Sequence, residues 1–272
     1  MKYTFKDFQR DFPTEDVCLE YIFKQKYPEV TKYYRVKKRK CYAHAVTGHQ
    51  IHPLKGTIFE KSSTPLTTWF YAIYQFSTSK NGVSAMKLQR DLGVTYKCAW
   101  RIAKKIRELM EEGTMNLSGT VEVDETFIGG RNVMGRRLHN KEAVMGMVER
   151  QGRVKAKHIK LRQTHILLNE IKENVAQDAR LLSDEYKAYK KTPSLGYTHE
   201  SVKHGHKEYA RGDVHTNTIE GFWSQLKRSI HGTYHVISPK YLQSYVNEFS
   251  FRYNRRSSEL PVFFHLLNEV VG

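Results

Sequence analysis

The sequence predicts a mixed α/β protein whose N-terminal part is helical and whose central part is built on a sheet. Up to about residue 112, several segments place apolar residues at the spacing of amphipathic helices. From Gly119 the period changes to two, and three strand-like segments precede the next helical pattern. Three strands, a helix, a further strand and then helices form the order expected of an RNase H-like fold.

The composition is strongly basic, with 45 Lys and Arg against 28 Asp and Glu and a net charge of +17. Such an excess attracts polyanions and speeds their capture, which favours a nucleic-acid partner. Ribosomal and membrane-surface proteins are also basic, so charge alone leaves those classes open. At 272 residues the chain is long enough for one sizeable core and one or two small appended domains.

Several features of the sequence predict a cytoplasmic protein. No apolar run reaches the roughly eighteen residues that a membrane span needs. The N-terminus carries acids and aromatic residues where a signal peptide needs a basic start and an apolar stretch. Cys18, Cys41 and Cys98 are widely spaced and contain no Cys-x-x-Cys pair, so we expect no disulfide framework.

Residues 1–60 form the first predicted module. Acidic cap residues followed by apolar residues at helical spacing predict a short helix over 14–27. The basic stretch that follows interleaves cations with tyrosines and ends at a Leu-Lys-Gly turn signal at 54–56. This composition suits contact with phosphates, and the alternative is a solvated basic loop. The candidate DNA contacts are Lys37, Lys38, Arg39 and Lys40.

Residues 61–112 have the pattern of a helix-turn-helix region. A proline begins a buried helix over 65–78. Ser84 then caps the segment AMKLQRDL, Gly93 allows a tight turn, and Thr95 caps a second helix.

The second helix divides into an apolar and a basic face. The apolar positions are Cys98, Ile102, Ile106 and Met110 or Leu109. The basic positions, mostly outside this face, are Lys97, Arg101, Lys104, Lys105 and Arg107. A recognition helix in a major groove needs this division, although two short helices joined by glycine also occur in proteins that never contact DNA.

Residues 113–272 contain the predicted sheet. Alternating or apolar patterns predict strands over 120–130, 143–150, 154–161 and 179–185. Amphipathic patterns predict helices over 165–175, 216–230, 241–256 and 261–271.

Three acids of this region lie in separate elements. Asp124 is in the first strand, on the face opposite Val121 and Val123, and Asp184 ends the fourth strand, where ligands collect at the carboxyl end of a sheet. Glu220 lies in the first turns of the next helix. A two-metal site that cleaves phosphodiesters needs carboxylates from separate segments, and hard oxygen ligands suit Mg²⁺ or Mn²⁺. Any one such acid is more often a cap or a surface charge, but the joint pattern is rarer.

Other charged residues surround these acids in the sequence. Lys227 follows Glu220 by two helical turns and can reach a phosphate, and Arg228 beside it is a candidate DNA contact. Glu122 and Glu125 are expected to tune the local field or to face solvent. The histidines near the acidic helix are expected to contact DNA, and they are His204, His206, His215, His231 and His235. Trp223 and Tyr234 could stack on unpaired bases, with core packing at least as good an interpretation of Trp223.

Five strings in order resemble the bacterial insertion-sequence transposases related to eukaryotic Merlin elements, the ISXO-type family. They are GTIFEKSSTPLTTWFYAIY, VEVDETFIGG, LLSDEYKAY, HTNTIEGFWSQLKR and YVNEFSFRYNRR. The resemblance covers most of residues 15–258. It implies excision and integration of an element by hydrolysis and strand transfer, with a divalent metal, terminal inverted repeats, a target duplex and homo-oligomers on DNA. It also implies a bacterial host, with the protein near the nucleoid.

The third metal ligand stays open between two residues. Many members of the family have Asn in place of the third acid, and this chain has both Asn217 and Glu220, three residues apart on one helix. We favour Glu220 because an ionised carboxylate binds a hard cation better than an amide does, and because Lys227 is correctly spaced from it. Asn217 would then hold a phosphate, a water or Glu220 itself.

The N-terminal module departs from the family pattern. The family begins with a zinc ribbon of two Cys-x-x-Cys pairs, but here the first pair is missing and His44 and Thr47 occupy the second. A stable zinc site needs four Cys or His ligands. Cys41, His44, His49 and His52 lack the tight turns of such a site, so we expect a degenerate, metal-free ribbon.

Two other functions remain possible on this sequence. One is a DNA-binding regulator, or an inactive transposase remnant, that keeps the helix-turn-helix and has lost its acid site. The other is a structure-selective nuclease on the same fold, which would cleave DNA without joining it.

Overall fold

The computed structural model describes residues 3–129, 141–202 and 212–271 and divides the chain into two compact units. The first unit comprises Met1–Met110 and Ser257–Gly272, and the second comprises Glu111–Arg256. The expected catalytic domain over 113–272 is therefore too long at its C-terminal end. The physical reason is the apolar helix α9 (Val262–Val271), which buries Phe263 among aromatic residues of the first unit.

The first unit is mainly helical. Its helices are α1 (Phe5–Asp11), α2 (Glu15–Lys26), α3 (Leu66–Thr78), α4 (Ala85–Leu92), α5 (Tyr96–Glu108) and α9. Helix α1 was not predicted, and it begins at Thr4, whose hydroxyl accepts from the Asp7 N–H while the Asp7 carboxylate accepts from the Thr4 N–H. Rings from α1, α3 and α9 pack together, with Phe263 stacked on Tyr3 at 5.0 Å between centroids.

The basic stretch after α2 forms a small antiparallel sheet. Its strands are β1 (Tyr33–Arg35), β2 (Tyr42–His44) and β3 (Gln50–Ile51), in that spatial order. The candidate cations of residues 37–40 therefore lie in the turn between β1 and β2.

The predicted pair of helices after α3 is present. Ser84 accepts from the N–H of Lys87 to cap α4, which ends at Gly93 with a φ of 64°. The hydroxyl of Thr95 accepts from the N–H of Cys98 and caps α5. A left-handed conformation at Gly93 is available to glycine without steric cost, which explains the tight turn.

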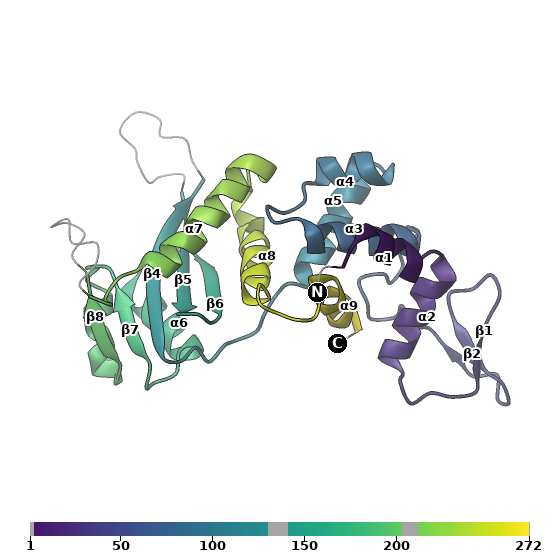
Figure 1. Ribbon diagram of the computed structural model, residues 1–272, viewed down its shortest axis with the longest axis horizontal. Coiled ribbons are helices and arrows are strands. Elements are labelled where there is room, and N and C mark those ends of the chain that lie inside the picture. The colour runs from purple at the N-terminus through teal and green to yellow at the C-terminus, as the bar shows by residue number, and fades with distance from the viewer. Residues whose placement is uncertain (1–2, 130–140, 203–211, 272) are drawn as a thin grey trace. The chain divides into compact units, whose positions relative to one another are not determined.

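The second unit is built on a five-stranded mixed sheet (Figure 1). Its strands are β4 (Thr120–Ile128), β5 (Glu142–Glu149), β6 (Val154–Ile159), β7 (Arg180–Ser183) and β8 (Thr198–Ser201). The spatial order is β6-β5-β4-β7-β8, with β4 antiparallel to β5 and parallel to β7. The predicted mixed α/β architecture is confirmed. Strand β8 was not predicted because its sequence, THES, carries no apolar alternation.

Helices cover both faces of this sheet (Figure 1). One face packs Val121, Val123 and neighbouring strand residues against Leu167 and Ile171 of α6 (Thr164–Asn174). The other face packs against α7 (Asn217–Ser229) and α8 (Leu242–Asn254). Even-numbered positions of β4 thus face α7, as the strand period of two requires. No helix among the described residues has the length and apolar character needed to cross a bilayer.

Candidate active site

Two of the predicted acids lie side by side on the sheet. The parallel register of β4 and β7 pairs Val123 with Ser183, so the next residues, Asp124 and Asp184, extend that register on neighbouring strands. Neighbouring strands are about 4.8 Å apart. Asp124 points to the face that α7 covers, where it contacts Trp223, and Asp184 is close enough for its charge to raise the pKa of Asp124. The structure therefore brings together acids that are sixty positions apart in the chain.

The environment of Asp124 opposes its ionisation. Burial raises the pKa of Asp124 to about 7, and the negative charges of Asp184 and Glu125 add to the rise. Two hydrogen bonds lower that pKa: one from the backbone of Glu125, and one from the indole N–H of Trp223, which donates to Oδ2 of Asp124 at 3.0 Å. A nearby cation would relieve both the desolvation and the repulsion.

Trp223 reaches Asp124 because the sheet leaves room for its ring. Gly146 on β5 is the residue paired with Asp124 in the antiparallel register. A Cβ atom on Gly146 would lie 2.5 Å from Cζ2 of Trp223 and 2.8 Å from Cδ1 of Ile219. Trp223 is only 4% exposed, so the core-packing interpretation of this residue holds and base stacking by its ring does not. The sequence did not indicate its hydrogen bond to the acid.

Glu122 is completely buried, and the expectation that it faces solvent is wrong. Its Oε2 accepts from the backbone N–H groups of Thr218 and Ile219 at 2.8 and 3.0 Å. These N–H groups lie in the first turn of α7, where no helix carbonyl is available to accept from them. Its Oε1 accepts from Nε of Arg150 at 2.7 Å. Glu122 thereby attaches the beginning of α7 to the central strand. The signal in the sequence that could have indicated this role is the position of Glu122 two residues before Asp124, on the same face of the predicted strand.

Glu125 is also buried, on the opposite face of the sheet. Its carboxylate accepts from the hydroxyl of Tyr189 at 2.7 Å and from Arg162 at 2.7 Å. The guanidinium of Arg162 lies 3.6 Å from the ring centroid of Tyr186, whose N–H donates to Oδ1 of Asp184 at 3.0 Å. These contacts connect the turn that carries Asp184 to β4. Of the two expectations for Glu125, exposure to solvent is wrong, and an effect on the local field is confirmed because its charge raises the pKa of Asp124.

The remaining candidates, Asn217, Glu220 and Lys227, all lie on α7. Asn217 and Glu220 are exposed, and Glu220 accepts from the Thr216 hydroxyl at 2.8 Å. At about 100° per residue, Glu220 and Lys227 are turned roughly 60° and 40° from the direction of Trp223, whereas Asn217 is turned about 120°. Because Trp223 points at Asp124, the flank that carries Glu220 and Lys227 is nearer to the acids of the sheet.

Asp124 and Asp184 are the residues of this site that could hold a metal ion. Within residues 3–129, 141–202 and 212–271, no group of three or more His, Cys, Asp or Glu side chains is arranged to hold a metal ion. Asp124 and Asp184 nevertheless suit a hard cation, since they offer carboxylate oxygens whose mutual repulsion a divalent ion would remove. Glu220 would have to turn toward the pair to complete a set of three.

The candidate DNA contacts of the first unit differ in their solvent exposure and in whether an acid already pairs with them. Lys37, Lys38 and Arg39 are exposed at the turn between β1 and β2. Lys40, in contrast, forms an ion pair with Glu15 at 2.8 Å.

The Lys and Arg side chains of helix α5 range from exposed to buried. Lys97 and Lys105 are exposed, and Lys104 is half-buried. Arg101 is exposed but donates to the hydroxyl of Thr64 at 3.2 Å. Arg107 was expected mostly outside the apolar face, yet it is only 3% exposed and donates to the carbonyl of Val83 at 3.0 Å. That expectation is wrong because Arg107 joins α5 to the segment before α4.

The cysteine and histidines of the ribbon-like module make other contacts. Cys41 is buried, with its Sγ 3.9 Å from Oε1 of Gln50. Nδ1 of His44 lies 3.0 Å from the hydroxyl of Thr47. His49 and His52 are exposed. Of the histidines expected to contact DNA, His204 and His206 lie outside the described residues.

Comparison with known proteins gives three findings. The model of a family described as the ISXO2-like transposase domain matches residues 116–254. A protein of Halobacterium salinarum, described as an uncharacterized protein in transposable element ISH50, is 26% identical over 220 residues, which are 72% of each chain. One chain in the cryo-EM structure of a simian T-cell lymphotropic virus intasome in complex with PP2A regulatory subunit B56 gamma is similar with a TM-score of 0.32 and 14% identity. That similarity covers 70% of this chain and 73% of the other.

Proposed function

The chain belongs to the ISXO2-like transposase domain family, and from that premise we propose that it is a DNA transposase that cleaves at element ends and joins them to target DNA. The observation that carries the proposal is the half-buried pair of Asp124 on β4 and Asp184 directly after the neighbouring strand β7, close enough for the charge of one to raise the pKa of the other. The sheet supports it, because three antiparallel strands followed by two parallel ones agree with an RNase H-like core.

The proposed chemistry uses acids on the sheet and residues of α7. Asp124 and Asp184 would hold Mg²⁺ or Mn²⁺, with Glu220 as the third ligand and Asn217 as the alternative. When bound, the ions supply charge stabilisation at the phosphate and activation of the attacking oxygen. Lys227, on the same flank of α7 as Glu220, would hold a phosphate of the reacting strand.

Two further residues position this machinery. Trp223 orients the carboxylate of Asp124 through its Oδ2 atom and would hold that acid in place for a cation. Glu122 fixes the N-terminus of α7 against β4, which sets the distance of α7 from the sheet. Both act through buried contacts and neither is proposed to touch DNA.

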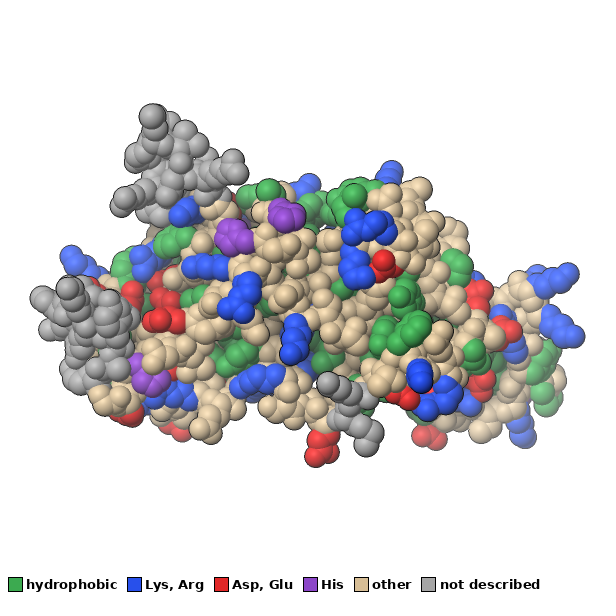
Figure 2. All heavy atoms as spheres, turned by 45° about the horizontal axis from the view of Figure 1, so that its top comes forward, with side chains coloured by type: hydrophobic (Ala, Val, Ile, Leu, Met, Phe, Trp, Pro, Cys, Tyr) green, Lys and Arg blue, Asp and Glu red, His purple; other side chains and the backbone are tan. Residues whose placement is uncertain are grey.

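Double-stranded DNA is the proposed partner, both as terminal inverted repeats and as target. Helix α5 would bind the major groove through Lys97, Arg101, Lys104 and Lys105, and the β1–β2 turn would contact phosphates. Figure 2 shows Lys and Arg side chains on the surface of both units, which is consistent with a polyanionic partner. Arg228 on α7 is exposed and would add a contact in the second unit, and DNA-bound chains would form homo-oligomers.

Joining of DNA ends tests the proposal. Protein, a duplex carrying the terminal repeats and Mg²⁺ should give products in which an end is joined to a target plasmid. Asp124→Asn and Asp184→Asn should abolish cleavage and joining while binding to end DNA stays within a few-fold, because α5 is a separate element. Cleavage without joining would identify a nuclease, and binding without either reaction would identify a regulator or an inactive remnant.

A further inference from the structure

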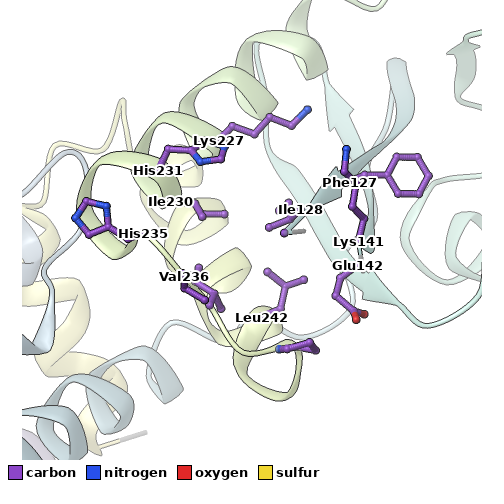
Figure 3. Close-up of a pocket in the computed structure, with 13 residues that line it drawn as sticks. Phe127, Ile128, Lys141, Glu142, Lys227, Ile230, His231, His235, Val236 and Leu242 are labelled. Carbon is purple, nitrogen blue, oxygen red and sulfur yellow. The ribbon is translucent and has the colours of Figure 1, made fainter. Parts of the chain in front are cut away.

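A pocket of about 780 Å³ lies in the second unit beside the C-terminal end of α7. Its centre is apolar, and Figure 3 shows Ile128, Ile230 and Leu242 facing one another there. These three residues are buried parts of the core between the sheet and helices α7 and α8. Val236 also lines the pocket, yet it is 86% exposed, so an apolar side chain lies open to solvent at this site.

The same pocket has more basic than acidic side chains among the residues that the structure describes. Two lysines, Lys141 and Lys227, and two histidines, His231 and His235, line it, and Glu142 is the one acid among these described lining residues. Oε2 of Glu142 lies 2.7 Å from Nε2 of His158, so a histidine already faces that acid. The pocket therefore combines an apolar centre with a wall that attracts anions.

The backbone around the pocket departs from regular geometry. Helix α7 ends in a turn of π-helix, η3 (Ile230–Tyr234), and His235 follows with a φ of 59°. π-helical turns are rare, and those that occur are often found at functional sites. A positive φ at a residue other than glycine is a strained conformation. The π-helical turn and the positive φ of His235 reverse the direction of the chain after α7. Val236 and its neighbours can therefore line the same pocket as Ile128 of β4 and Glu142 of β5.

We propose that this pocket binds an unpaired nucleotide at the end of the DNA that is cleaved. A nucleotide has both features that the pocket matches, an apolar base and an anionic phosphate. A base within a duplex is stacked and paired, so only an unpaired or extruded one can enter a pocket. Ile128 lies four residues beyond Asp124 in β4, about 13 Å along the strand, so the pocket is within reach of a strand held at the acids.

This inference rests on the proposed function and adds a substrate feature to it. Lys227 would connect the pocket with the proposed metal site, because it lines the pocket and lies on the flank of α7 that carries Glu220. The ligand expected is DNA with an unpaired terminal nucleotide.

Fluorescence of 2-aminopurine tests the inference. The probes are two duplexes of the element end, one blunt and one with 2-aminopurine as a single unpaired terminal nucleotide. Wild-type protein should bind the second duplex about tenfold more tightly than the first and change the 2-aminopurine signal. The variants Lys141→Ala and Val236→Ser should each lose that preference and keep their affinity for the blunt duplex.

Matched substitutions outside the pocket serve as controls. Lys160→Ala removes an exposed cation of the same unit, and Leu161→Ser removes an apolar side chain that is 56% exposed. Both should keep the preference for the unpaired nucleotide. Equal binding of the two duplexes by wild-type protein, or an unchanged preference in both pocket variants, would overturn the inference. Absence of binding to either duplex would instead contradict the proposed function.

Discussion

The indole N–H of Trp223 donates to Oδ2 of Asp124 at 3.0 Å, and this bond joins α7 to the central strand at its most perturbed acid. The bond fixes one oxygen of the carboxylate and partly offsets the burial that raises its pKa. Gly146 makes the contact possible, since the ring occupies the space that a side chain on β5 would need.

Loss of that bond should move the pH dependence of activity. In Trp223→Phe the donor is gone, so the pKa of Asp124 should rise further above its present value of about 7. The acid limb of the rate–pH profile should shift upward by about one pH unit. Trp69→Phe is the matched control, because it removes an indole N–H that donates to Ser62 at 3.1 Å in the other unit. A profile unchanged in Trp223→Phe would separate Trp223 from the ionisation of Asp124.

Ionisation of Asp124 should destabilise the protein when divalent cations are absent. Its pKa of about 7 exceeds the roughly 3.9 of an unfolded Asp, so the folded state binds the extra proton between these values. The favourable contribution is complete below about pH 4 and is lost as pH rises through 7, at a cost on the order of 4 kcal/mol. Urea unfolding of wild type and Asp124→Asn from pH 4 to 8 should show this difference.

Mg²⁺ should reverse the effect at high pH. At pH 8, saturating Mg²⁺ should raise the free energy of unfolding of wild type and leave Asp124→Asn nearly unchanged. If Mg²⁺ stabilises both proteins equally, Asp124 is not a ligand.

A methyl group at position 146 should disturb the site through packing. Gly146→Ala should cost about 1–3 kcal/mol of stability, because the ring of Trp223 and the Ile219 side chain must move. Gly221→Ala on α7 is the control, since nothing lies within 4 Å of its added Cβ and alanine favours a helix by about 1 kcal/mol. Urea denaturation measures both, and the indole N–H resonance of Trp223 should shift only in Gly146→Ala.

The third ligand can be decided by rates on intact and pre-nicked ends. Glu220→Gln should lose about 100-fold or more in rate, since removal of a charge from the metal site costs several kcal/mol. Asn217→Ala should act more mildly, because Asn217 is turned farther from Trp223. If the order of the two effects is reversed, Asn217 is the ligand, and Asn217→Asp should then retain activity.

Most helices and strands of the second unit were predictable because the sequence pattern that predicts each of them lies within one segment of the chain. The alternation in residues 120–128 and 142–149 and the helical spacing in 217–229 each lie within one segment, and the structure has those elements. The short strand β8 was not predictable, because its sequence THES has no alternation of apolar residues. The packing of α9 on the first unit was not predictable either, because an apolar helix face does not specify its partner.

The motifs and periodicities along the chain were enough to assign the family, the mixed α/β architecture, and Asp124 and Asp184 as candidate acids. The burial of Glu122 under α7 and the contact of Trp223 with Asp124 could be seen only in the folded protein. The partners in these bonds are 96 and 99 residues apart along the chain. A residue's own neighbours set its secondary structure, but its burial and its pKa depend on which distant segments the sheet register brings against it.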